Sequence, residues 1–190
     1  PDVPEERHFN LPDATRRIQA AYDALGIRYA TSVIGQDPCA ALTELHDAGG
    51  TLLTGGWGKG AREAATVGSL YEAMEPLLMD RHAAHDAQVR AVEDLIALLD
   101  PDLTRYLPGA LLFDQIEETI ATRRYTGLGG ATDFHYPVAL SAPTYPDAPL
   151  PADTFDYALL RRYASNSGTA IGGSRDEALL HALNECAERD

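Results

Sequence analysis

The chain has few cysteines, few basic residues and no long apolar run, and each scarcity excludes a class of protein. Cys39 and Cys186 are the only cysteines; two isolated thiols form neither a disulfide framework nor a zinc site, and they suit a reducing cytoplasm. The formal net charge is −14, which argues against nucleic-acid partners and anionic membrane surfaces, because both require clustered Lys and Arg. No apolar run approaches the ~20 residues of a membrane span. We therefore expect a cytoplasmic protein with no nucleic-acid partner and no membrane association.

Length and composition are those of an ordinary folded domain. Hydrophobic residues make up 45% and charged residues 23% of the chain, which is typical of globular proteins. A chain of 190 residues can bury one core. We expect one domain over residues 1–190. The acidic N-terminal sequence PDVPEERHFN lacks the apolar region of a signal peptide.

Local patterns predict a helix, a strand and an ambiguous segment in the first third of the chain. Asp13 is the expected N-cap of an amphipathic helix that ends at Gly26. Residues 27–34 are rich in β-branched and aromatic side chains and predict a strand. Residues 38–56 fit a short helix, because of Pro38 and several alanines. They also fit a hairpin, because DAGG separates two apolar runs.

The rest of the chain is predicted with less detail. We expect helices over 61–79 and 86–99, the second stopped by Pro101. Residues 103–140 hold strands or short helices, 144–154 form a Pro-rich connection, 155–164 fit either strand or helix, and a final helix begins near Arg175.

The clearest motif is a frame that occurs twice. From Gly60 the chain reads GAREAATVGSLYEAME, and from Gly173 it reads GSRDEALLHALNECAE. Each copy has a glycine-rich entry followed by a helix with two glutamates three residues apart. Glu72 and Glu75 form the first pair, and Glu185 and Glu188 form the second. Residues at i and i+3 lie on one face of a helix.

Two such pairs suggest a site for a hard cation. Mg²⁺ in proteins takes a few carboxylates, several waters and the phosphates of a substrate. Four carboxylates on two facing helices would suit Mg²⁺ held against a triphosphate. This hypothesis requires the two helices to approach each other closely. The alternative is two solvated helix faces that happen to look alike.

Other site types fit the sequence poorly. GGWGKG is no Walker A loop, because Leu53 and Gly60 stand where that motif requires Gly and Ser or Thr. There is no Glu-x-x-His pair for a di-iron bundle and no G-x-S-x-G elbow for a serine hydrolase. Trp57 is interpreted as a packing residue, with a cover over the nucleotide as the alternative, and Cys186 as a small core residue.

The repeated frame carries a resemblance to a known family. Residues 165–190, SNSGTAIGGSRDEALLHALNECAERD, resemble the second nucleotide motif of the YcaO-type ATP-binding domain. LTGGWGKGAREAATVGSLYEAMEPL resembles the family's first nucleotide motif, and Tyr136-Pro137 resembles a short strand that ends in Pro. The resemblance implies an α/β, YcaO-like fold, with sheet layers that carry the two Glu-x-x-Glu helices, and it favours the hairpin over 38–56.

The resemblance also implies cofactors and site residues. The expected cofactors are ATP and Mg²⁺. Glu72, Glu75, Glu185 and Glu188 would bind Mg²⁺, and Lys59, Ser167, Glu177 and Arg189 would contact ATP. Residues 12–80 would hold the first motif, 81–150 an intervening segment, and 151–190 the second motif. No catalytic residue is nominated, because the family's catalytic tail lies beyond the matched motifs.

The implied function is ATP-dependent activation of a backbone amide in a ribosomally synthesised peptide, to give an azoline or a thioamide. The expected partners are a precursor peptide and a leader-binding or E1-like clamp protein. The resemblance covers only the N-terminal half of the family's domain, and the last helix has no capping signal. A missing C-terminal half, or a second chain, is therefore expected. The first motif departs from the family at Gly68, where Ser is usual, and at Pro76, where Arg is usual. A non-catalytic YcaO-like scaffold subunit is the alternative.

Overall fold

The computed structural model describes residues 7–99, 107–127, 130 and 133–189. The chain divides into two compact units, residues 1–78 with 167–190, and residues 79–166. Each unit has its own sheet and its own hydrophobic core. Within the described ranges, no helix has both the length and the apolar character needed to cross a bilayer.

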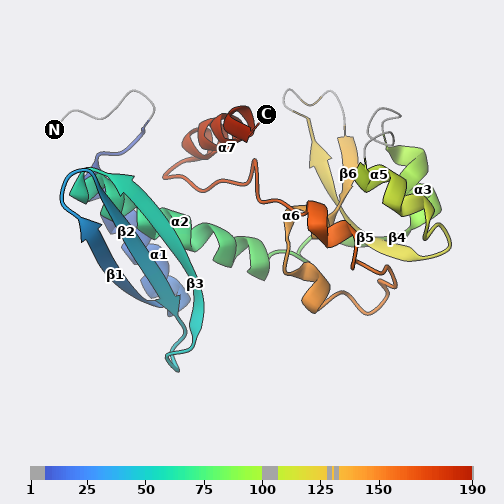
Figure 1. Ribbon diagram of the computed structural model, residues 1–190, viewed down its shortest axis with the longest axis horizontal. Helices are drawn as coiled ribbons and strands as arrows, with labels where there is room; N and C mark the ends of the chain where they lie inside the picture. The colour runs from blue at the N-terminus through green and yellow to red at the C-terminus, as the bar shows by residue number, and fades with distance from the viewer. Residues whose placement is uncertain (1–6, 100–106, 128–129, 131–132, 190) are drawn as a thin grey trace. The chain divides into compact units, whose positions relative to one another are not determined.

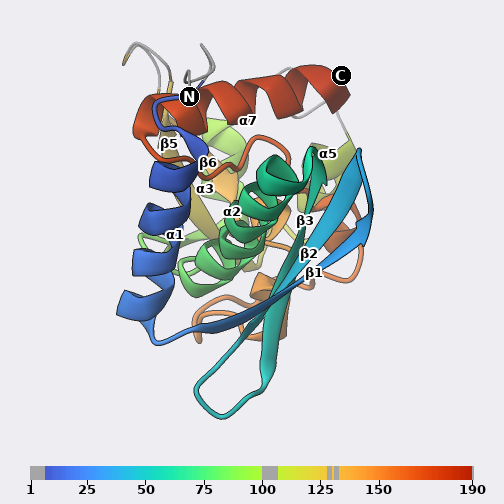
Figure 2. The same cartoon turned by 90° about the vertical axis from the view of Figure 1, so that its left-hand side faces the viewer.

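The first unit combines a three-stranded antiparallel sheet with helices (Figures 1 and 2). Its elements are α1 (Leu11–Leu25), β1 (Arg28–Gly35), β2 (Cys39–His46), β3 (Leu52–Gly60), most of α2 (Arg62–Arg81) and α7 (Arg175–Arg189). The strand order is β1-β2-β3. The strand predicted over 27–34, the hairpin over 38–56 and the helices near 61–79 and from 175 are therefore confirmed.

The ends of α1 follow from its capping residues. The side chain of Asn10 accepts a hydrogen bond from the Asp13 N–H at 2.9 Å, so Asn10 is the N-cap and the assignment to Asp13 is wrong. An amide oxygen two residues before Pro12 satisfies one of the open N–H groups of the first turn. Gly26 ends the helix in the left-handed conformation, with φ 65°, as predicted.

The core of this unit lies between the helices and one face of the sheet. Its larger buried side chains are Ile18 and Tyr22 of α1, Leu45 of β2, and Leu70 and Met74 of α2. The hydroxyl of Tyr22 donates to the backbone oxygen of Leu70, which satisfies a polar group that would otherwise be buried without a partner.

Two glycines let β3 lie directly against α2. A Cβ at Gly58 would stand 1.9 Å from the carbonyl oxygen of Ala65, and one at Gly56 would stand 2.1 Å from the amide nitrogen of Ala73. No side chain fits at either distance. The alternating glycines of GGWGKG therefore serve backbone packing, and Trp57 between them is 52% exposed on the opposite face of the sheet.

The close contact gives a paired prediction. Gly58→Ala should lower the free energy of unfolding by about 3 kcal/mol or prevent folding, because the backbones of β3 and α2 would have to move apart to admit the new methyl group. Gly68→Ala is the control, since a Cβ there meets only the Gly58 Cα, at 3.7 Å. That change should raise stability by roughly 0.5–1 kcal/mol, as expected for Gly to Ala inside a helix. Urea unfolding of both variants measures the difference, and equal midpoints would contradict the packing argument.

The second unit contains a three-stranded antiparallel sheet, β4-β5-β6, with short helices (Figure 1). Its elements are β4 (Gln88–Ala91), α3 (Val92–Leu98), α5 (Leu107–Phe113), β5 (Thr119–Thr126), β6 (Asp133–Pro137), α6 (Val138–Ser141) and the 3₁₀ turns Tyr145–Asp147 and Leu160–Tyr163. Its core includes Val92, Leu95, Leu112, Ile120 and Val138.

The helix predicted over 86–99 is wrong in its first part. Asp86 has a positive φ of 58°, and residues 88–91 pair with β5; only Val92–Leu98 is helical. Val89 fits a helical stripe and a strand equally well, and the pairing with a distant strand decides between them. Pro101, the predicted stop, lies outside the described residues. Residues 155–164 contain a 3₁₀ turn rather than a strand or an α-helix.

Two buried tyrosines in this unit share one carboxylate. The Tyr145 and Tyr157 hydroxyls donate to Oδ2 of Asp153, at 2.7 and 2.6 Å. The same oxygen accepts from the Ala121 N–H at 3.1 Å. Burial, followed by the hydrogen bond to Asp153, raises the pKa of Tyr157 above that of a free phenol. Burial is also the main cause of the raised pKa of Tyr145.

These raised pKa values predict loss of stability in alkali. Above pH ~10 the unfolded chain ionises its tyrosines while the folded one keeps Tyr157 neutral, so stability falls as pH rises. Tyr157→Phe should cost about 1–2 kcal/mol at pH 7, where the hydrogen bond is lost. It should also flatten the decline above pH 10. Urea midpoints from pH 7 to 11 test this, with the 42% exposed Tyr163, changed to Phe, as the control. An unchanged slope in Tyr157→Phe would contradict the assignment.

Candidate functional site

A pocket of about 380 Å³ lies in the first unit. The segment before α1, the first turn of α1, the N-terminal half of α2 and the start of α7 line it. Apolar side chains such as Leu11, Val67 and Ile171 form much of the wall. The acidic and basic residues around it are Arg7, Glu63, Glu72, Glu177 and His181. A concave, mostly apolar wall with a few polar groups is the usual form of a small-molecule site.

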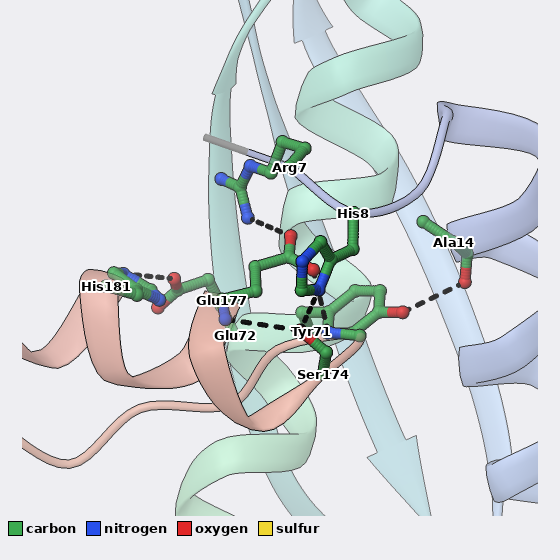
Figure 3. Close-up of polar contacts among 9 residues, drawn as sticks. Arg7, His8, Ala14, Tyr71, Glu72, Ser174, Glu177 and His181 are labelled. Carbon is green, nitrogen blue, oxygen red and sulfur yellow. Dashed lines mark hydrogen bonds and ion pairs between the residues drawn. The ribbon is translucent and has the colours of Figure 1, made fainter. Parts of the chain in front are cut away.

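Polar contacts with the start of α7 hold the N-terminal segment beside the pocket (Figure 3). Oε1 of Glu177 accepts from Nη1 of Arg7 at 2.9 Å, and Oε2 accepts from the Gly173 N–H at 3.1 Å. The Glu177 N–H donates to Oγ of Ser174 at 3.2 Å, and the His8 ring contacts the same hydroxyl. Ser174 and Glu177 thus stabilise the helix start much as a capping box does.

Tyr71 links α2 to α1 at the wall of the pocket. Its hydroxyl donates to the backbone oxygen of Ala14 at 3.1 Å (Figure 3). Burial, and then the negative charge of Glu177, raises the pKa of Tyr71. The phenol therefore stays neutral and remains a hydrogen-bond donor at neutral pH. Gly68 lies one turn earlier on the same wall.

His181 brings together one glutamate from each repeated frame. Its Nε2 atom lies 3.9 Å from Oε1 of Glu72 on α2 and 4.0 Å from Oε1 of Glu185 on α7. Both distances are measured from the same nitrogen atom, so the two carboxylate oxygens lie at most about 8 Å apart. Figure 3 shows the contact between His181 and Glu72.

The other two glutamates differ in burial. Glu75 is only 5% exposed, whereas Glu188 is exposed near the end of α7. The Glu185 side chain is 16% exposed, and Glu75 and Glu185 each bury one carboxylate oxygen completely. In the described part of the chain, no group of three or more His, Cys, Asp or Glu side chains is arranged so that it could hold a metal ion.

The residues predicted to contact ATP differ in their position relative to the pocket. Glu177 lines the pocket. Lys59 is exposed and pairs with Ala40; it alternates with Gly58, so it points to the sheet face away from α2 and does not line the pocket. Ser167 is half-buried in the loop before α7. The side chain of Arg189 lies outside the described residues.

Some residues around the pocket were not predicted. Arg7, Tyr71 and His181 belong to neither glutamate pair, and the N-terminal segment was predicted only as a lead into α1. The one signal for His181 is its spacing, four residues before Glu185 on the same helix face. The interpretation of Cys186 as a core residue is wrong, because the structure leaves it exposed.

The donor chemistry fits Mg²⁺ and a phosphate ligand. Carboxylates are the side-chain ligands that Mg²⁺ prefers, and an octahedral ion completes its shell with water and phosphate oxygens. Glu72 and Glu185 supply such oxygens from two facing elements. The adjacent pocket is large enough for part of a nucleotide. The two carboxylate oxygens, at most about 8 Å apart, are near enough to share one hydrated ion.

The fold is a mixed α/β arrangement with two small antiparallel sheets, and comparisons with known proteins identify its family. The family model described as YcaO cyclodehydratase, ATP- and Mg²⁺-binding, matches residues 57–190. The chain belongs to the YcaO family.

Solved structures support the same fold. The structure of YcaO from Methanopyrus kandleri bound with AMPPCP and Mg²⁺ is 18% identical, with a TM-score of 0.57 over 96% of this chain. A heterocyclase in complex with substrate and cofactor is 16% identical, with a TM-score of 0.63 over 95% of this chain. The chain spans 43% and 28% of those two proteins. No curated protein sequence matches the chain.

The contacts of Glu177 predict a local effect. Glu177→Ala should lower stability by about 1–2 kcal/mol, because the start of α7 loses its cap and Arg7 loses its ion pair. Amide hydrogen exchange should rise at residues 8–10 and at Gly173. Asp176→Ala removes the same charge from the same turn at an exposed position and is the control. Equal exchange in the two variants would mean that Glu177 does not hold the N-terminal segment.

Proposed function

We propose that the pocket of the first unit binds ATP with Mg²⁺, and that the chain supplies the N-terminal half of the nucleotide site of a YcaO enzyme. The observation that carries the proposal is the convergence of Glu72 and Glu185 on His181 beside the pocket. Two carboxylates from the two copies of one sequence frame would hold a divalent cation. The match to a family model described as ATP- and Mg²⁺-binding supports the choice of ligands.

The residues would have distinct roles. Glu72 and Glu185 would bind Mg²⁺ directly or through water, with Glu75 and Glu188 as the second member of each pair. Glu177 orders the start of α7 and holds Arg7 at the pocket, where the guanidinium could also meet a phosphate. Lys59 would reach the nucleotide only after a rearrangement of β3. Ser167 and Arg189 remain proposed ATP contacts.

The proposed reaction is backbone-amide activation in a ribosomally synthesised peptide, with an azoline or thioamide as product. When bound, ATP would supply the phosphoryl group that activates the amide oxygen. The chain's own residues would position charge and exclude water rather than form covalent bonds. No general base is assigned within these residues.

The proposed partners follow from the similar solved structures and from the share of them that the chain spans. The similar heterocyclase was solved in complex with substrate and cofactor, which supports a precursor peptide as the substrate here. A leader-binding or E1-like clamp protein would deliver it. The share of the relatives that the chain spans, 43% and 28%, supports a further C-terminal half, in the same chain or in a second one. Two free cysteines suit a cytoplasmic location.

A scaffold role is the second candidate. Gly68 lines the pocket where the family usually has Ser, and Pro76 lies within α2 where Arg is usual. Both departures fall in the first motif, so a YcaO-like subunit that has lost nucleotide binding would show them.

Titration calorimetry of the full-length protein with AMPPCP and Mg²⁺ tests the proposal. Glu72→Lys or Glu185→Lys should weaken binding by a factor of about 100 or more, because each replaces a metal ligand with a like charge. Glu117→Lys, an exposed position in the second unit, makes the same change in net charge and should bind as the unchanged protein does. Circular dichroism establishes that each variant is folded. Saturable binding that all three variants retain equally would exclude this site, and no binding by the unchanged protein would favour the scaffold.

A further inference from the structure

The second unit carries a positively charged cluster on one face of its sheet. Partners in an antiparallel ladder share a face, and so do alternate residues along a strand. The register pairs Arg124 with His135, and Arg90 with Ile120. Arg90, Arg124 and His135 therefore lie on the same face, on three adjacent strands. We call these three residues the β4–β6 basic cluster.

The contacts within the cluster are specific. Nη2 of Arg90 donates to Oε1 of Gln88 at 2.6 Å and contacts Nε2 of His135 at 3.5 Å. Arg124 pairs with Asp133. Among the described residues, Asp133 is the carboxylate in contact with the cluster, and Arg124 balances its negative charge. With Arg124 paired to Asp133, the remaining full positive charge of the cluster lies on Arg90.

His135 is held in its neutral form. Burial, then the charges of Arg90 and Arg124, lowers the pKa of its ring below the usual value. A neutral ring that faces an arginine N–H through Nε2 accepts there, and its own proton lies on Nδ1. The ring therefore presents Nδ1–H as a donor.

Two donors in this cluster are buried without acceptors. Within the described residues, neither Nε of Arg90 nor Nδ1 of His135 has a hydrogen-bond partner, and both atoms are shielded from solvent. Buried donors are nearly always satisfied in native proteins, because desolvation without a hydrogen bond is costly. Both residues are only half-buried overall. Gln88 and Arg124, on the same sheet face, are exposed.

We propose that the β4–β6 basic cluster binds an oxyanion group, a carboxylate or a phosphate, through Arg90 and His135. An oxyanion offers several acceptor oxygens and a negative charge, which match the two N–H donors without acceptors and the positive charge of the Arg90 guanidinium. The site is formed by the second unit alone and does not depend on nucleotide binding. A carboxylate ligand would allow the second unit to hold an acidic side chain or the C-terminus of a peptide.

Nuclear magnetic resonance of the histidine side chains tests the proposal on the full-length protein without ATP or Mg²⁺. The chain has six histidines, and His135→Asn identifies the resonance of interest. Sodium acetate and sodium phosphate are titrated separately at constant ionic strength and pH. A saturable shift of the His135 ring nitrogens is expected with at least one anion. Acetate alone would indicate a carboxylate site, and phosphate alone a phosphate site.

Matched variants show whether the guanidinium is responsible. Arg90→Lys keeps the charge but removes the Nε donor, and it should weaken the anion by a factor of about ten or more, as loss of a charge-assisted hydrogen bond does. Arg28→Met removes one charge from exposed β1 and should leave the affinity unchanged. The His181 resonance reports any anion that enters the pocket instead. No shift of His135 with either anion, or equal affinity in both arginine variants, would overturn the proposal.

Discussion

The contact between the backbones of β3 and α2 is the constraint on which the first unit depends. Gly56 and Gly58 have no side chain, so the strand lies against Ala73 and Ala65 at a distance that excludes a Cβ. This contact fixes α2 against the sheet, and α2 carries Tyr71, Glu72 and Glu75. The pocket wall is therefore set by backbone packing, which is less compressible than a layer of flexible side chains. The glycines of GGWGKG serve the packing of β3 on α2, within the stretch that resembles the family's first nucleotide motif.

Electrostatic contacts complete the site that this packing begins. Glu177 uses both carboxylate oxygens, one for Arg7 and one for the Gly173 N–H, so the segment before α1 and the loop before α7 are held at the same place. Nε2 of His181 lies within 4.0 Å of a carboxylate oxygen of Glu72 and of one of Glu185, so the two helices present acidic side chains to the same place. The arrangement keeps carboxylates together in a region where a divalent cation would later stabilise them.

The second unit shows the opposite distribution of charge. Arg90, Arg124 and His135 gather on one sheet face, whereas Asp153 is enclosed by the two tyrosines that donate to it. Acidic side chains thus gather at the pocket of the first unit, and basic side chains gather on a sheet face of the second.

The sequence by itself determined the local elements and the family. The repeated frame located both glutamate helices, Gly26 marked the end of α1, and DAGG marked the hairpin, because each depends on residues near in the chain. Only the tertiary structure decided the rest. Residues 88–91 became a strand because β5 lies beside them, and Lys59 turned away from the pocket because α2 covers the other face of β3. Arg7, Tyr71, His181 and the β4–β6 basic cluster could not be predicted, because their roles arise from partners distant in sequence, which periodicity and local spacing do not report.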